Sequence, residues 1–346
     1  MANSLRIAVD AMGGDIGPRA VVAALLTSLR KHSGASALIF GDRQKVVQEL
    51  NACTDPTVLN RIHIRHCEVA IDDQDRPSAV LRHKQDSSMG LALKAVADGE
   101  AHACISAGNT GALMALGLVR LKTLPGISRP AICATFPTST GRSFMLDLGA
   151  NVDCSPRQLH QFAVLGSLTA QAIDNISAPI VRLLNVGEEE SKGGDDIAQT
   201  SALLESDPML NYQGYVEGDG VFKGTTDVVV CDGFAGNVAV KTSEGLAIMI
   251  KDMFKTLHTS SWTARLGAFL MRRKLIGLQA RLDPAFHNGA YLLGLNGVVI
   301  KSHGGASEKA FGHALEVALQ AAKHNLPSVL LPILKDKMDN KVNRGL

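Results

Sequence analysis

The sequence predicts an α/β protein with a three-layer α/β/α architecture and a mainly parallel sheet. Short apolar runs alternate with stretches of helical spacing along the whole chain, and this alternation is typical of βα units. Many of the apolar runs end in Gly, Asp or Asn, as strands that lead into turns do. A chain of 346 residues with 46% hydrophobic and 20% charged residues can also bury a large core.

The predicted strands are short runs rich in Val, Ile, Leu and Ala. They occupy residues 5–10, 36–40, 62–67, 130–137, 142–148, 180–185, 212–217, 227–231 and 297–302, and one further strand ends just before Gly108. Three consecutive valines in 227–231 are typical of a buried parallel strand. The runs 130–137 and 142–148 are separated by Thr-Ser-Thr-Gly and predict a hairpin.

The predicted helices lie between these strands. Apolar residues recur at helical spacing over 19–31, 77–97, 110–122, 156–173 and 195–206, in a long stretch after Asn237, and in a final stretch to about 323. Pro18 suits the first turn of the helix that follows it, and Pro156 begins the helix over 156–173.

The chain shows no linker rich in Pro, Gly or Ser, so we expect one α/β domain over residues 1–333. An amphipathic helical hairpin is expected as an insertion at about 246–282. Residues 334–346 are predicted to form a polar C-terminal tail.

Composition and missing motifs narrow the function classes. The net charge of +2 does not suggest nucleic-acid binding. The six cysteines form no C-x-x-C pair, which is typical of reduced core residues in a cytoplasmic protein. No apolar run reaches 18 residues, so we expect no membrane-spanning segment. The sequence has no P-loop, clean G-x-G-x-x-G, G-x-S-x-G or H-E-x-x-H motif, which leaves serine or thiol catalysis and a structural metal unsupported.

The turn from Gly108 to Gly111 joins a predicted buried strand to an apolar helix. Glycine lets the chain turn sharply and lets a ligand approach the backbone closely. Free N–H groups and the helix dipole favour an anion at such a helix N-terminus. Similar polar turns follow several other predicted strands.

Because ligands of open α/β sheets bind beyond the carboxyl ends of the strands, we expect these turns to form one site at one edge of the sheet. The candidate residues are Asp10, Gly13, Gly14, Asp15, Gly108, Asn109, Thr110, Asp147, Asn151, Asp153, Glu188, Glu189, Lys192, Asp232, Gly236, Asn237, Lys301 and His303. Among them, Lys192 and Lys301 supply positive charge, and Asn109 and Asn237 are neutral donors, which suits a small anion. The alternative is that Asp, Asn and Gly only cap helices and form turns.

Residues 253–282 contain no Asp or Glu, and their apolar residues recur at helical spacing. Such a basic, apolar hairpin is typical of a segment that contacts a membrane surface or an acidic protein. The candidate contact residues are Trp262, Leu266, Phe269, Arg272, Arg273 and Lys274. The alternatives are a dimer interface and an ordinary packed helix pair.

Six long motifs resemble those of the bacterial phosphate acyltransferases of phospholipid synthesis, and the resemblance extends from the first strand to about residue 325. The motifs are Val9-Asp-Ala-Met-Gly-Gly-Asp15, Ser106-Ala-Gly-Asn-Thr-Gly-Ala-Leu-Met114, Asp147-Leu-Gly-Ala-Asn-Val-Asp153, Leu184-Asn-Val-Gly-Glu-Glu-Glu190 with Lys192, Asp232-Gly-Phe-Ala-Gly-Asn-Val238 and Ile300-Lys-Ser-His-Gly304.

The resemblance implies that acyl-[acyl carrier protein] and inorganic phosphate react to give acyl phosphate and free carrier protein. It also implies a fold like that of the isocitrate dehydrogenase and phosphotransacetylase group, a homodimer, and no metal or organic cofactor. The expected location is the cytoplasm, with peripheral association at the inner face of the cell membrane. There a membrane glycerol-3-phosphate acyltransferase would receive the product.

For this reaction we expect Gly108, Asn109, Thr110, Lys192 and His303 to hold phosphate. Asn237 is the candidate oxyanion donor, and Lys301 is a second candidate. An alternative role for His303 is to accept the phosphate proton.

Three other functions remain open at this point. A phosphotransacetylase would use acetyl-CoA on a related scaffold. A nicotinamide-linked decarboxylating dehydrogenase would share the fold group, which binds its cofactor without the usual dinucleotide motif. A non-catalytic membrane scaffold would use the hairpin alone and would have no need of the polar turns.

Overall fold

The computed structural model describes residues 5–15, 17–189, 192–259 and 288–343, and between 259 and 288 only residues 262, 263, 266, 269–272, 277, 283 and 285. Within these residues one eleven-stranded sheet has the order β3-β2-β1-β4-β11-β10-β5-β6-β9-β7-β8. The strands are β1 (Leu5–Asp10), β2 (Ala35–Gly41), β3 (Ile62–His66), β4 (Ala103–Ser106), β5 (Ala131–Pro137), β6 (Arg142–Leu146), β7 (Ile180–Leu184), β8 (Asn211–Val216), β9 (Val228–Val230), β10 (Ala290–Leu293) and β11 (Val298–Lys301).

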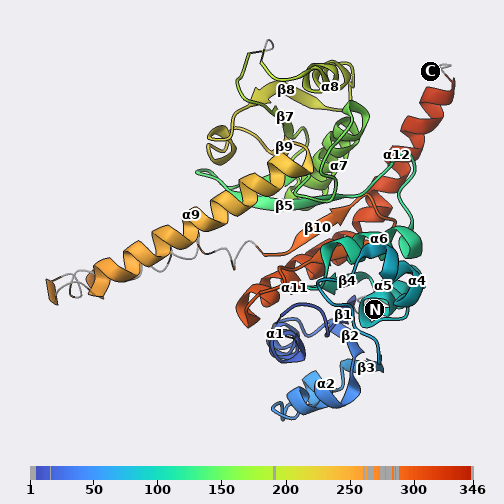
Figure 1. Ribbon diagram of the computed structural model, residues 1–346, viewed down its shortest axis with the longest axis vertical. Helices are drawn as coiled ribbons and strands as arrows, with labels where there is room; N and C mark the ends of the chain where they lie inside the picture. The colour runs from blue at the N-terminus through green and yellow to red at the C-terminus, as the bar shows by residue number, and fades with distance from the viewer. Residues whose placement is uncertain are drawn as a thin grey trace.

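Helices connect most of these strands (Figure 1). They are α1 (Gly17–Lys31), α2 (Arg43–Leu50), α3 (Pro56–Leu59), α4 (Pro77–His83), α5 (Ser88–Ala97), α6 (Thr110–Leu121), α7 (Pro156–Asp174), α8 (Asp195–Glu205), the 3-10 turn η1 (Gly220–Phe222), α9 (Gly233–Thr259), α11 (Glu308–His324) and α12 (Leu326–Asn343).

Alternate residues of each strand face opposite layers of helices, as the pleat of a strand requires. On β1, Ile7 and Val9 belong to the core shared with α1, α7 and α11, whereas Ala8 belongs to the core shared with α5 and α6. On β9, Val228 and Val229 divide between the two cores in the same way. The predicted three-layer α/β/α architecture is therefore confirmed.

The sheet contains two parallel sets of strands that run in opposite directions. β1, β2, β3, β4 and β11 pair in parallel, and so do β6, β9, β7 and β8. Between the sets, the pairings β11–β10, β10–β5 and β5–β6 are all antiparallel, so the second set runs opposite to the first.

The expectation that every strand end gathers at one edge of the sheet is therefore wrong. It failed because the sequence analysis missed β10, whose four residues follow the predicted helical hairpin of residues 246–282. The predicted hairpin between β5 and β6 is confirmed, and it supplies one of the three reversals. A twist of about 20–25° per pairing turns the second set across the first.

The single helix predicted over 77–97 is two helices, α4 and α5. Ser87 caps α5, because its hydroxyl accepts the Gly90 N–H at 3.3 Å. A Cβ at Gly90 would lie 2.0 Å from the carbonyl oxygen of Gln85, so the short residue permits this tight turn. Helix α4 ends at His83, and the polar residues 84–86 and the serine cap therefore interrupt the helix that apolar spacing predicts.

The C-terminal segment also differs from its prediction. Helix α12 begins at Leu326 and continues to Asn343, through most of the segment expected to be a polar tail. Leu326, Leu330 and Leu334 are buried in the main core, which anchors the helix at its start.

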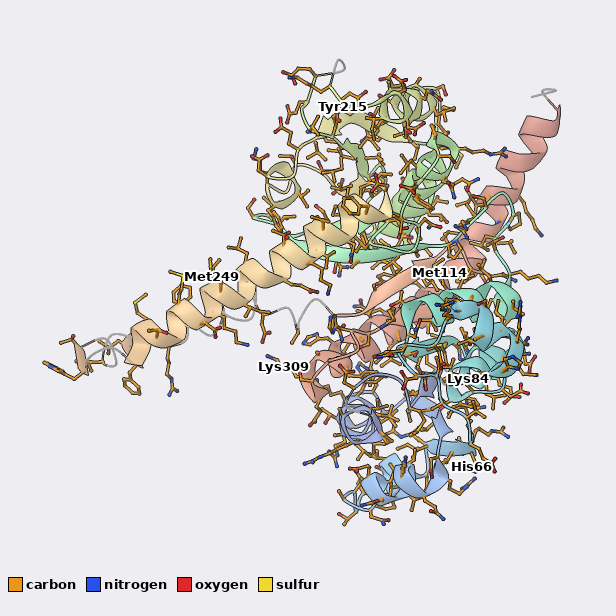
Figure 2. The ribbon with its side chains drawn as sticks, viewed as in Figure 1. His66, Lys84, Met114, Tyr215, Met249 and Lys309 are labelled. Carbon is orange, nitrogen blue, oxygen red and sulfur yellow. The ribbon has the colours of Figure 1, made fainter. Side chains whose placement is uncertain are left out.

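Helix α9 leaves the body of the molecule and projects outward (Figure 1), and Met249 lies on this projecting part (Figure 2). The helix ends at Thr259, within the segment in which the sequence predicts a helical hairpin. Beyond it, Trp262, Leu266, Phe269 and Arg272 are exposed, whereas Arg273 and Lys274 lie outside the described residues. Among the residues described, none of the helices has both the length and the apolar character to cross a bilayer.

Candidate active site

Three loops meet at the carboxyl ends of β1, β4 and β11. Asp10, the last residue of β1, is buried and accepts hydrogen bonds from the hydroxyls of Ser88 and Ser106, each at 2.7 Å. Burial raises the pKa of Asp10, and the two serine hydrogen bonds oppose that rise. Ser106 also accepts the Gly108 N–H at 3.0 Å, so this carboxyl group orients the turn that follows β4.

Glycines allow these loops to pack backbone against backbone. A Cβ at Gly13 would lie 2.6 Å from the nitrogen of Gly108 and 2.9 Å from its Cα. Gly14 has a φ of +85°, and a Cβ there would lie 2.7 Å from the carbonyl oxygen of Gly304. That carbonyl also accepts the Asp15 N–H at 3.0 Å. The structure thus brings together the candidates that follow β1, β4 and β11.

Lys301 ends β11 at the centre of this group. Its Nζ donates to the carbonyl of Ala107 at 3.1 Å and to the carbonyl of Ser302. Burial lowers the pKa of Lys301 from its ordinary value of 10.5 to about 8. The neighbouring carboxylates of Asp73 and Asp10 oppose that shift, and the positive charge of Lys241 adds to it. An ammonium group has three donors, so one remains for a ligand.

The lowered pKa of Lys301 has a consequence for stability. Between pH 8 and 10.5 the lysine is protonated in the unfolded chain but not in the folded protein, so stability increases with pH in this window. We expect the free energy of unfolding of wild type, relative to that of Lys301→Met, to rise by at most about 3 kcal/mol. Urea denaturation of both proteins at pH 7, 8, 9 and 10 checks this. A constant difference would contradict the buried-cation environment.

Several candidates have the structural roles that the alternative interpretation gave them. Asn109 caps α6 by accepting the Ala112 N–H at 2.9 Å, and its amide nitrogen donates to the carbonyls of Asp73 and Asp75. Thr110 begins that helix and is half-buried. Asp232 accepts the Ala235 N–H at 2.7 Å in the first turn of α9.

Asp147 and Asn151 shape the loop after β6. The buried carboxylate of Asp147 accepts the backbone N–H groups of Ile132, Ala150 and Asn151, and also the side-chain amide of Asn151. Burial raises the pKa of Asp147, and these hydrogen bonds oppose it. The Asn151 amide also donates to the carbonyl of Pro130 at 2.9 Å. The carboxylate of Asp147 and the amide nitrogen of Asn151 are therefore occupied within the protein, whereas Oδ1 of Asn151 is buried without a hydrogen-bond partner among the described residues.

The start of α9 joins this second cluster of loops to the first. Gly236 packs so closely that a Cβ would lie 1.9 Å from the carbonyl oxygen of Asp147. The exposed side chain of Asn237 lies beside Gly149. One turn later, the Nζ of Lys241 lies 3.2 Å from Nε2 of His303. Although the two strand sets run in opposite directions, α9 brings Asn237 and His303 to the same region.

The sequence analysis missed three residues of this region, Ser88, Ser106 and Lys241. Lys241 was detectable, because residues four apart share one face of a helix and Asn237 was already a candidate. The two serines gave no comparable signal, since they meet Asp10 only in the folded sheet.

The loop after β7 is organised within itself. The side chain of Asn185 donates to the carbonyls of Gly187 and Lys192, and the Lys192 N–H donates to the carbonyl of Glu189. Lys192, Glu188 and Glu189 are exposed, as is Asp153 in the loop after β6. Within the described residues, the hydrogen bonds of Lys192 do not reach the loops of β1, β4 or β11.

Comparison with solved structures agrees with the fold. A phosphotransacetylase from Streptococcus pyogenes matches with a TM-score of 0.61 and 17% identity, over 93% of this chain and 95% of that one. A branched-chain phosphotransacylase from Enterococcus faecalis V583 matches with a TM-score of 0.57 and 16% identity, over 92% and 99%. At such low identity these likenesses show the fold alone.

Comparison of sequences is more specific. The family described as fatty acid synthesis protein matches residues 5–329. A phosphate acyltransferase of Pseudomonas syringae pv. syringae (strain B728a) is 49% identical over 324 residues, which are 94% of this chain and 95% of that protein. One from Nitrosococcus oceani is 48% identical over the same shares. The chain therefore belongs to the fatty acid synthesis protein family and, within it, to the phosphate acyltransferases.

Proposed function

We propose that this enzyme transfers a fatty acyl group from acyl carrier protein to inorganic phosphate and so supplies acyl phosphate for phospholipid synthesis. The observation that carries the proposal is that Lys301, His303 and Lys241 meet at the glycine-lined loops that follow β1 and β4. Asn237 lies one helical turn before Lys241 on α9. Cations and a helix N-terminus suit the phosphate, and a neutral amide suits the developing oxyanion.

Phosphate itself is the nucleophile in this reaction. One phosphate oxygen attacks the thioester carbonyl carbon, the new C–O bond forms and the C–S bond breaks. The carrier-protein thiol leaves with the proton that hydrogen phosphate gives up, either directly or by way of His303. The enzyme then has to position two reactants and stabilise one oxyanion, which needs no metal or organic cofactor.

We assign phosphate to the turn after Gly108, to His303 and to the Lys192 loop, and the oxyanion to Asn237, with Lys301 as the second donor. Because the Asn109 amide is already used within the protein, the backbone N–H groups at the start of α6 are the donors expected from that turn. Lys192 is exposed and has a long side chain, which suits a residue that meets its ligand only when the ligand is bound.

Apolar side chains next to Asn237 suit the acyl chain. Phe234 and Val152 are 66% and 62% exposed, and the Phe234 N–H donates to the carbonyl of Val152 at 3.3 Å. Exposed apolar side chains that adjoin a polar site are typical of a surface for an apolar ligand. We therefore assign the acyl chain to this side of Asn237.

A phosphotransacetylase that uses acetyl-CoA is the other candidate, because the solved structures that share the fold include such enzymes. The test is thiol release from a long-chain acyl carrier protein and from acetyl-CoA, each with and without phosphate. We expect release that requires phosphate and strongly favours the carrier protein. Faster release from acetyl-CoA would favour the phosphotransacetylase, and release without phosphate would contradict both.

We also propose a homodimer in the cytoplasm that associates with the inner face of the membrane and delivers its product to the glycerol-3-phosphate acyltransferase. Apolar side chains on the projecting part of α9 support the membrane contact, because Ile248, Met249 and Met253 are each more than half exposed. Trp262 is 76% exposed beyond them. Such a surface near basic residues suits anionic lipid, with the carrier protein or the dimer partner as the alternative occupant.

A further inference from the structure

His303 has a hydrogen-bond donor facing each of its ring nitrogens. The backbone N–H of Gly305 points at Nδ1 at 3.2 Å, and the Nζ of Lys241 lies 3.2 Å from Nε2. A neutral imidazole offers one acceptor nitrogen and one N–H, and an imidazolium offers no acceptor. The ring can therefore accept from only one of these two donors.

The Gly305 N–H determines which nitrogen accepts. A backbone amide always carries its hydrogen, so Nδ1 accepts and the ring proton sits on Nε2. The backbone N–H of His303 donates to Oδ1 of Asn288 at 2.9 Å, and Asn288 itself donates to Ser302 and Ala310, which fixes the backbone that carries the ring. The Nε2–H group and the Lys241 ammonium group are then two donors that face the same small region.

From this geometry we infer that Lys241 and His303 together bind one oxygen of the phosphate substrate, with Lys241 as a phosphate-specificity residue. An anionic oxygen between Nε2–H and Nζ accepts from both donors and replaces their mutual repulsion with two charge-assisted hydrogen bonds. This inference rests on the proposed function, and it adds to that function a residue that no motif singled out.

Two further contacts support the role of Lys241. Oε2 of Glu244 lies 2.8 Å from Nζ and holds the ammonium group near His303, while two of its three donors remain for other acceptors. Lys241 also lies close enough to Lys301 to act on it electrostatically, so two lysines and one histidine border the same region. Lys241 shares a helix face with Asn237, which places the phosphate oxygen near the proposed oxyanion donor.

The test compares Lys241→Gln, Lys241→Arg, His303→Asn and the double variant Lys241→Gln/His303→Asn. Lys94→Gln is the matched control, because Lys94 is also an exposed lysine of a helix, α5, that pairs with a nearby carboxylate, Asp98. We expect Lys241→Gln to raise the KM for phosphate about 10- to 100-fold, with the KM for acyl carrier protein unchanged. Lys241→Arg should restore part of the loss, and Lys94→Gln should change neither constant.

The double variant separates a shared oxygen from two independent roles. If both donors bind the same oxygen, the KM of the double variant for phosphate should rise over that of wild type by much less than the product of the two single-variant fold increases. Titration calorimetry with inorganic phosphate gives the same comparison without turnover. An unchanged phosphate KM in Lys241→Gln, with an active and phosphate-dependent wild type, would overturn this inference and leave the proposed function standing. A wild type that needs no phosphate would overturn both.

Discussion

Replacing Asn237 with alanine is expected to lower kcat by about 10²- to 10³-fold while the protein remains folded. Removal of one preorganised oxyanion donor costs an acyl-transfer enzyme about this much. The Asn237 side chain is exposed beside Gly149 and lies one helical turn before Lys241 on α9, so its amide is available to a ligand. The KM for each substrate should change little, because the interaction strengthens only as the oxyanion forms.

Asn237→Asp sharpens this test. It retains the shape of the side chain but replaces a donor with a negative charge, which repels both phosphate and the oxyanion. We expect its activity to be lower still than that of Asn237→Ala. Asn211→Ala is the matched control, since Asn211 lies on β8 at the far edge of the sheet and donates to the carbonyl of Ala178. Wild-type kcat in Asn237→Ala would remove this residue from the catalytic machinery.

Gly236→Ala is expected to destabilise the protein by about 1–3 kcal/mol or more. The added Cβ would lie 1.9 Å from the carbonyl oxygen of Asp147 and 2.9 Å from Sγ of Cys231. The nearest obstacle is backbone in the buried loop after β6, so it has little freedom to move. Because the start of α9 carries Asn237 and Lys241, activity should fall together with stability.

The same helix supplies the control for this prediction. A Cβ at Gly245 would meet no heavy atom within 4 Å, so Gly245→Ala should stabilise the helix by up to about 1 kcal/mol through propensity alone. Opposite signs for the two glycine variants in urea denaturation would establish that close packing, and not helix propensity, determines the outcome. A stabilised Gly236→Ala would mean that α9 and the β6 loop are less closely packed than the structure describes.

Much of the fold was predictable because it depends on local pattern. The valine run of β9, the hairpin of β5 and β6, and the apolar spacing of α7 each have a periodicity that short-range sterics and burial impose. The prediction was wrong for residues whose structure depends on partners in other strands or loops. β10 is only four residues long, and it forms a strand because β11 and β5 pair with it on both sides.

The candidate site shows the same division. Asp10, the glycines, Lys301 and His303 could be named from the sequence because turns after strands have a recognisable composition. Asn109, Asp147 and Asn151 could be named too. Spacing could not distinguish a polar side chain that is available to a ligand from one that caps a helix or hydrogen-bonds within a loop. Only hydrogen-bond partners distant in sequence make that distinction.

The sequence by itself determined the layer architecture, the family and the composition of the polar turns, because these follow from local patterns and long motifs. The tertiary structure alone decided which turns meet. Three antiparallel pairings reverse half of the sheet, and the first turns of α9 bring Asn237 and Lys241 to His303 across that reversal. Strand direction and helix trajectory arise from pairings and contacts between residues far apart in the chain, and no local pattern encodes them.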